Sequence, residues 1–165
     1  MAIIDAIVAE LEQEASTTRR VLERVPEDKF AWKPHPKSFS LGQLSMHIAG
    51  AQKILAEMAA KDVHEIAMVP PAEPTSRKQL LQVMDYSTAG AKQILGKIED
   101  AKLPSIWTLT RNGKPLFSIP RIAFIRSILM NHIIHHRGQL SVYLRLLDVP
   151  VPSIYGPSAD ENPFG

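Results

Sequence analysis

Cysteine is absent from the 165 residues of this chain. Its absence excludes disulfide bonds, thiolate metal sites and a cysteine nucleophile, and it fits a reducing compartment such as the cytoplasm. The formal net charge is only +2, and the lysines and arginines are scattered along the chain. We therefore expect no nucleic-acid partner, because proteins that bind nucleic acids usually gather positive charge on one face.

Long apolar runs are also lacking. The most apolar stretch, residues 122–134, is interrupted by Arg126, Asn131 and His132, and it falls short of the ~20 residues that a helix needs to cross a bilayer. The N-terminus lacks the basic start and unbroken apolar segment of a signal peptide. With 45% hydrophobic and 22% charged residues, the composition is typical of a globular protein. We expect one cytoplasmic domain over residues 1–165, with no membrane partner.

Four segments carry apolar residues at the three-and-four spacing of amphipathic helices. The predicted helices cover residues 2–25, 40–61, 76–100 and 120–147. Ser40 with Gln43, and Ser76 with Gln79, have the form of capping boxes that would start the second and third helices. The predicted architecture is an all-α four-helix bundle with long connections and an extended C-terminal tail.

Prolines and glycines mark the connections between these helices. Residues 63–74 contain three prolines and are expected to lack regular structure. Asn112-Gly113 lies between residues that favour strands and signals a hairpin, which Pro115 would keep short and irregular. Residues 149–165 contain four prolines and form the predicted tail.

Histidine is concentrated in one place, since three of the six histidines lie within residues 132–136 of the predicted fourth helix. Residues four apart lie on one face of a helix, so His132 and His136 point the same way. His135 lies about 100° from His136, at the border of the apolar stripe. In the second helix, His47 lies on the edge of the inward stripe. His47, His132 and His136 are therefore candidate ligands of one cation.

Core histidines that are satisfied by hydrogen bonds are the alternative interpretation. Two stacked imidazoles on an apolar stripe favour the metal site, because each buried ring must satisfy two nitrogens and two protonated rings would repel each other. A cation would use one nitrogen of each ring. Imidazole suits zinc, nickel, iron and copper alike, so the pattern indicates a divalent metal ion without selecting its identity.

Other motifs for metal or nucleotide chemistry are missing from the sequence. His64-Glu65 begins like the helix of a zincin, but the second histidine does not follow. No glutamate has a histidine three residues later, which excludes the signature of di-iron bundles. A glycine-rich phosphate loop and a Gly-x-Ser-x-Gly turn are also absent.

Three stretches of the chain share a pattern with one known family. Residues 131–147, with the run His135-His136-Arg137-Gly138-Gln139, are similar to the last helix of that family, and residues 149–157 are similar to the tail that follows it. Residues 32–44, which lead to His47, are similar to the start of its second helix. In these features the chain resembles the DinB/YfiT-like superfamily.

The resemblance implies a four-helix bundle, often a homodimer, in which His47, His132 and His136 hold a divalent metal such as zinc, nickel or iron. Characterised relatives include S-transferases and isomerases that use mycothiol, bacillithiol or glutathione. Three protein ligands leave a coordination position for water or substrate. The leading hypothesis is a metal-dependent enzyme that transfers a low-molecular-weight thiol, held as thiolate, to an electrophilic small-molecule substrate.

Two alternatives stay open. A metal-dependent hydrolase would use the open position for water with a pKa lowered toward ~7, although no carboxylate stands out as its general base. A non-enzymatic metal-binding stress-response protein would bind the metal without turnover. The sequence assigns no catalytic acid or base for any of these functions.

Overall fold

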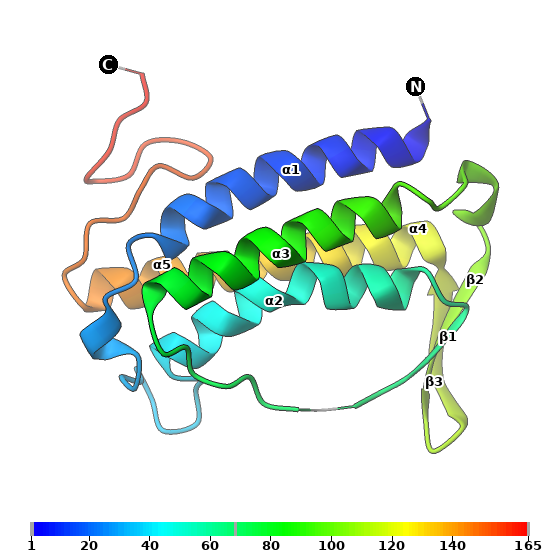
Figure 1. The fold of residues 1–165 in the computed structure, drawn as a ribbon, viewed down its shortest axis with the longest axis horizontal. Coiled ribbons are helices and arrows are strands. Elements are labelled where there is room, and N and C mark those ends of the chain that lie inside the picture. Colours follow the sequence, from blue (N-terminus) through cyan, green and yellow to red (C-terminus); the bar gives the residue numbers. More distant parts are fainter. Residues whose placement is uncertain (1, 68, 165) are drawn as a thin grey trace.

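The computed structural model describes residues 2–67 and 69–164. Its long helices lie side by side as a bundle, and a small sheet lies at one end (Figure 1). The helices are α1 (Ile3–Leu22), α2 (Leu41–Ala59), α3 (Arg77–Leu95), the short α4 (Arg121–Ala123), a π-helical segment (Phe124–Met130) and α5 (Asn131–Leu146). Single 3-10 turns cover Glu27–Lys29 and Asp100–Lys102. Within the described residues, no helix combines the length and hydrophobicity of a membrane span.

The two predicted serine caps start α2 and α3. Ser40 Oγ accepts the Gln43 N–H at 3.1 Å, and Gln43 Oε1 accepts the Ser40 N–H at 3.0 Å, which completes the capping box. At α3 only half of the box forms, because Gln79 Oε1 accepts the N–H of Thr75 rather than that of Ser76. The first turn of α2 is therefore the more firmly fixed of the two.

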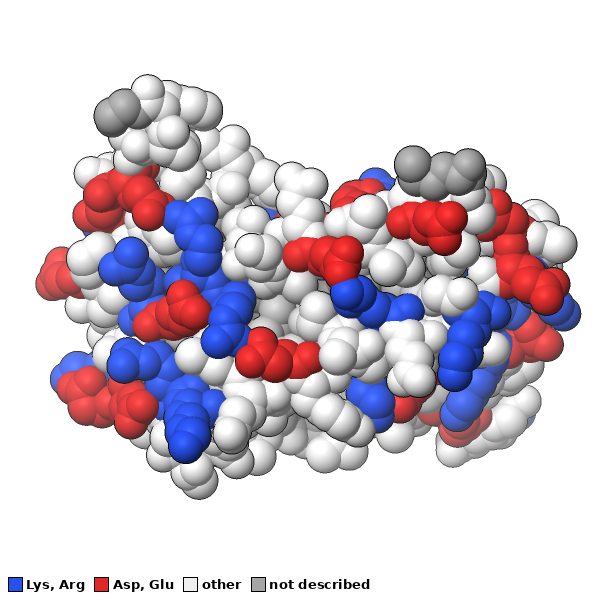
Figure 2. Space-filling view, turned by 45° about the horizontal axis from the view of Figure 1, so that its top comes forward, with Lys and Arg blue, Asp and Glu red and all other residues white. Residues whose placement is uncertain are grey.

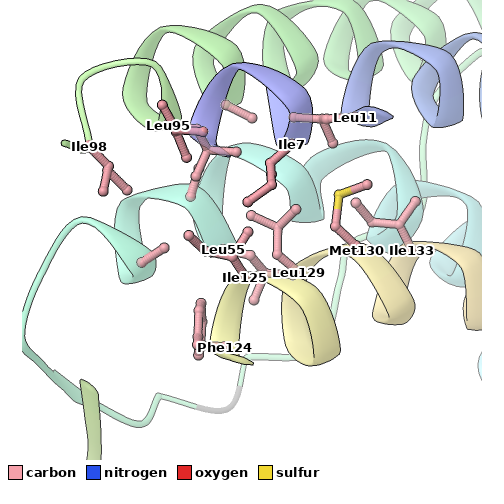
Figure 3. Close-up of a cluster of buried hydrophobic side chains, with 14 of the residues drawn as sticks. Ile7, Leu11, Leu55, Leu95, Ile98, Phe124, Ile125, Leu129, Met130 and Ile133 are labelled. Atoms are coloured by element: carbon pink, nitrogen blue, oxygen red, sulfur yellow. The ribbon is translucent and has the colours of Figure 1, made fainter. Parts of the chain in front are cut away.

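Two clusters of buried apolar side chains fill the bundle. The first, drawn in Figure 3, joins α1, the second half of α2, the end of α3 and the π-helical segment. The second joins the end of α1, the first half of α2, the start of α3 and the second half of α5. In α2 the change from one cluster to the other falls between Ala49 and Ala51, and in α5 between Ile133 and Leu140. The predicted histidines lie beside this boundary, with His47 two residues before Ala49 and His136 between Ile133 and Leu140.

The prediction of an all-α fold is wrong in one part, because a three-stranded sheet accompanies the helices (Figure 1). β2 (Ile106–Arg111) pairs antiparallel with β3 (Lys114–Pro120) and parallel with β1 (Val63–Glu65). The hairpin turn at Asn112-Gly113 is confirmed, and both residues have positive φ, as a turn of this kind requires. The strands are longer than Pro115 led us to expect, since Pro115 lies on the edge strand next to a register shift.

β1 contradicts the expectation that residues 63–74 lack regular structure. The prolines of this connection follow β1 rather than interrupt it. The Glu65 carboxylate accepts the Thr110 hydroxyl at 2.6 Å and the Asn112 N–H, so that β1 is attached to the hairpin through a side chain as well as through backbone pairing. The Thr110 hydrogen bond lowers the pKa of Glu65 below its usual value. The predicted connection and tail also include Met68 and Gly165, which lie outside the described residues.

The π-helical segment changes which face of the fourth helix is buried. A regular helical wheel predicts a core stripe of Ile125, Leu129, His136, Tyr143 and Leu147. Ile125 and Leu129 are buried, but His136, Tyr143 and Leu147 are only half-buried. The buried stripe of α5 instead comprises Ile133, Arg137, Leu140 and Leu144. The hydrogen bonds of a π-helix span an additional residue, which rotates everything that follows relative to a regular α-helix.

Arg137 is buried in the bundle, with 1% of its surface exposed. Its Nη2 lies 2.7 Å from Glu14 Oε2, and its Nη1 donates to the Glu14 carbonyl oxygen at 3.1 Å and to Thr18 Oγ1 at 3.2 Å. Tyr155 of the tail donates to Glu14 Oε2 at 2.8 Å, and its ring centroid lies 4.9 Å from Arg137 Cζ. One buried ion pair therefore connects α1, α5 and the tail.

Charged side chains of both signs are mixed on the face shown in Figure 2. Ion pairs join neighbouring elements, as between Arg19 of α1 and Asp85 of α3. The predicted extended tail is held in the same way, since Asp160 pairs with Arg145 and Glu161 pairs with Arg20. Exposed pairs of this kind contribute little each, typically about 0–1 kcal/mol.

Replacing Arg137 with alanine should lower the free energy of unfolding by about 3–5 kcal/mol, because the Glu14 carboxylate would be left buried without its cation. Arg126→Ala is the matched control, since Arg126 of the π-helical segment pairs with Glu10 of α1 at the exposed surface. This substitution should cost only about 0.2–1 kcal/mol. Urea unfolding followed by circular dichroism measures both values. An equal decrease in the free energy of unfolding in the two variants would contradict a structural role of the buried ion pair.

Candidate metal centre

The structure brings together the three predicted histidines from two helices. His47 lies in the first half of α2, and His132 and His136 lie one turn apart in α5. His132 Nε2 lies 3.2 Å from His47 Nε2 and 3.1 Å from His136 Nε2. One potential ligand atom from each ring lies within 4.8 Å of the others. His135 is exposed and outside this group, as the helical wheel predicts, although its ring centroid lies 4.9 Å from that of His136.

The spacing of these nitrogens fits a single metal ion. Two imidazole nitrogens on one tetrahedral zinc ion, at ~2.0–2.1 Å from it, lie about 3.3 Å apart. The two Nε2 separations of 3.1 and 3.2 Å are close to this value. Neutral imidazole has only one N–H, so three ring nitrogens that face one another cannot all be satisfied by hydrogen bonds among themselves. The three histidines are thus positioned to hold a metal ion.

Gln139 determines which nitrogen of His136 faces the site. Gln139 Oε1 lies 2.7 Å from His136 Nδ1, and an amide oxygen can only accept. His136 Nδ1 therefore carries the proton, and Nε2 presents its lone pair to His132 and His47. This arrangement, in which the outer nitrogen of a ligand histidine donates to an oxygen, is common around metal sites. His132 Nδ1, by contrast, is buried and has no hydrogen-bond partner among the described residues.

Burial keeps the three rings neutral. It lowers the pKa of His47 to about 4 and that of His132 to about 4, and repulsion from His136 adds to both shifts. The pKa of His136 is lowered by burial as well, against the opposing hydrogen bond to Gln139. Neutral imidazole is the form that binds metals. At neutral pH the site therefore offers three lone pairs rather than three positive charges.

An aromatic group borders the histidines on one side. The Phe39 ring, just before the cap of α2, has its centroid 5.9 Å from that of His47. Tyr143 of α5 donates to the Phe39 carbonyl oxygen at 3.4 Å, and its ring stands edge-on to Trp32 at 5.6 Å. The sequence indicates the place of two of these aromatic residues, since Phe39 precedes a capping box and Tyr143 follows His136 by two helical turns. The helical wheel assigns Tyr143 to the core instead.

A family model described as "DinB family" matches residues 3–162. The chain belongs to the DinB family. The resemblance found in the sequence is thereby confirmed, and it extends over nearly the whole chain.

One relative by sequence and two solved structures are similar to this chain at low sequence identity. The uncharacterized protein YrdA of Bacillus subtilis (strain 168) is 23% identical over 167 residues, which cover 96% of this chain and 91% of YrdA. A DinB-like protein from Bacillus cereus ATCC 10987 has a crystal structure with a TM-score of 0.74 and 22% identity, over 93% of this chain and 98% of its own. The DinB-like protein YjoA from Bacillus subtilis gives a TM-score of 0.69 and 21% identity, over 90% and 97%. These structures show the shared fold.

Replacing Gln139 with alanine should change the tautomer of His136, because the acceptor that holds the proton on Nδ1 is removed. Imidazole ¹⁵N chemical shifts of the metal-free protein measure this directly. We expect one Nδ1–H form in the wild type and a mixture in Gln139→Ala. Gln139→Glu keeps an oxygen acceptor and should retain the single form. Unchanged shifts in Gln139→Ala would show that the hydrogen bond does not set the tautomer.

Proposed function

We propose that His47, His132 and His136 bind one divalent metal ion and that this DinB-family chain is a metal-dependent enzyme acting on small molecules. The convergence of three imidazole nitrogens from two separately fixed helices carries this proposal: His132 Nε2 lies 3.2 Å from His47 Nε2 and 3.1 Å from His136 Nε2, and all three rings offer a nitrogen within 4.8 Å of the others. Three protein ligands are the number found in catalytic zinc sites, where the fourth position is open to water or substrate. Structural zinc sites usually have four protein ligands.

Transfer of a low-molecular-weight thiol is the reaction that we propose for this site. A divalent cation supplies Lewis acidity, which lowers the pKa of a bound thiol and favours the nucleophilic thiolate. The chain contains no cysteine, so the reacting sulfur comes from a cosubstrate such as bacillithiol, mycothiol or glutathione. In the transfer, sulfur bonds to an electrophilic carbon, and the leaving group departs with the electrons of the broken bond.

The protein's own residues have distinct roles in this proposal. His47, His132 and His136 present neutral lone pairs, and Gln139 keeps the His136 ring in the orientation that points Nε2 inward. The described group of potential ligands consists of these three histidines and contains no carboxylate. A hydrolase would need a general base for its water, so this composition favours thiol transfer over hydrolysis.

Metal analysis of histidine variants tests the ligand set. We expect one divalent ion per chain in the wild type and loss of stoichiometric metal in His47→Ala and His136→Ala, because two imidazoles alone bind too weakly to survive dialysis. His135→Ala is the matched control, since this exposed neighbour lies on the same helix and should retain the metal. Full metal content in His47→Ala and His136→Ala would overturn the assignment.

The reaction is tested on the metal-loaded wild type with glutathione or bacillithiol and monochlorobimane as the electrophile. We expect conjugate formation that requires both the metal and the thiol, and that disappears in His136→Ala but not in His135→Ala. Fluorescence of the bimane conjugate measures the rate. Tight metal binding without turnover of any thiol would instead support the non-enzymatic metal-binding protein.

A further inference from the structure

We propose that Phe39, Tyr143 and Trp32 form an aromatic subsite beside the three histidines, which takes an apolar or aromatic group of the small molecule bound at the metal. This inference rests on the proposed metal centre and specifies which substrates that centre would prefer. It concerns a part of the site that contributes no ligand atom.

Phe39 places an apolar surface next to the histidines. Its side chain is 38% exposed, although its ring packs against the ring of His47 at 5.9 Å between centroids, with 52° between the planes. A molecule bound at His47 Nε2 would therefore extend past a ring that is accessible on one side. Sites for small molecules commonly combine such apolar surface with a few polar groups that fix the orientation of the ligand.

The position of Phe39 is fixed by its neighbours on both sides. Its carbonyl oxygen accepts from Tyr143 Oη, and the next residue, Ser40, is the buried cap of α2. Ser40 Oγ also donates to Glu73 Oε1 at 2.6 Å, which attaches the connection before α3 to the same point. Phe39 is thus held in place at the start of α2, rather than carried on a free loop.

Tyr143 and Trp32 extend the aromatic surface away from the metal ligands. Tyr143 follows His136 by two turns of α5, so both side chains project on the same side of that helix. Trp32 meets the Tyr143 ring edge-on, with 82° between the planes, a favoured geometry for aromatic pairs. The loop that carries Trp32 is closed by a hydrogen bond from the Leu41 N–H to the Trp32 carbonyl oxygen at 2.8 Å.

Together the histidines and the aromatic residues would select a ligand by the substituent that its reactive atom carries. The histidines act on the reacting end, whereas the aromatic residues can contact a flat or apolar group only a few atoms away. A ring on the ligand can pack on Phe39 edge-to-face or offset, which a short polar chain cannot do. The substrate class is therefore a thiol or electrophile with an aromatic or bulky apolar substituent.

Cobalt-substituted protein provides a test that does not depend on turnover. The probes are benzyl mercaptan and 2-mercaptoethanol, and the cobalt–thiolate absorption band measures the Kd of each. In the wild type we expect benzyl mercaptan to bind more tightly than 2-mercaptoethanol. In Phe39→Ala the Kd of benzyl mercaptan should rise roughly tenfold, while that of 2-mercaptoethanol should change less than about twofold.

Phe117→Ala is the matched control, because Phe117 is 40% exposed and lies on β3, at the end of the bundle away from the start of α2 (Figure 1). It should leave both Kd values unchanged. Phe39→Tyr keeps the ring and should retain the preference. Phe39→Leu keeps most of the bulk without the ring, and it should lose the preference even if Phe39→Ala proves too unstable to measure.

The outcomes separate this inference from the proposed function. Absence of a cobalt–thiolate band in the wild type with both thiols would overturn the metal-bound thiol and the subsite together. A band with both thiols would overturn the subsite alone if the wild type bound the two thiols with equal affinity, or if each Phe39 variant lost the same affinity for 2-mercaptoethanol as for benzyl mercaptan. Selective loss of benzyl mercaptan binding in the Phe39 variants supports it.

Discussion

The buried ion pair between Arg137 and Glu14 fixes the rotation of α5, and the geometry of the site depends on that rotation. Arg137 can satisfy its guanidinium only where it meets Glu14 and Thr18 of α1. Turning α5 by one residue would leave a buried charge unpaired, which costs several kcal/mol. Since His136 adjoins Arg137 in the chain, holding Arg137 toward α1 also holds His136 toward α2. An interaction that touches none of the three histidines thereby determines where two of the three imidazoles point.

The third imidazole is positioned independently. The complete capping box at Ser40 fixes the first turn of α2, and His47 follows two turns later in an uninterrupted helix. The site thus joins two rigid elements rather than two loops, which suits a constellation that must keep its nitrogens within a few tenths of an ångström. Burial lowers the pKa of each of the three imidazoles, so the same packing that positions the rings keeps them neutral, which is the form that binds a cation.

Local pattern was enough to predict the four helices, the Asn112-Gly113 turn and the histidine group, because each depends on spacing along the chain. His132 and His136 lie on one side of their helix however that helix is rotated about its axis. Their proximity could therefore be predicted, although the predicted buried stripe of the helix is wrong.

The π-helical segment has no signature in composition, and β1 depends on pairing with residues more than 40 positions away. Glu14 falls on the polar side of an isolated α1, and only its partner 123 positions later explains why it is buried.

The error in the helical wheel is informative about the site. A regular fourth helix would direct Tyr143 into the core together with Ile125 and Leu129, and Phe39 would lose the hydroxyl that holds its carbonyl oxygen. The π-helical segment shifts the buried stripe of α5 to Ile133, Leu140 and Leu144. His136 and Tyr143, which share another side of α5, are therefore only half-buried. One local departure from α-helical hydrogen bonding therefore affects the orientation of His132, His136 and Tyr143 alike, because all three follow it in the same run of helix. This shared origin makes the two features parts of one candidate site. In the function that we propose, the histidines would act on the reacting atom and the aromatic residues would select the molecule that carries it.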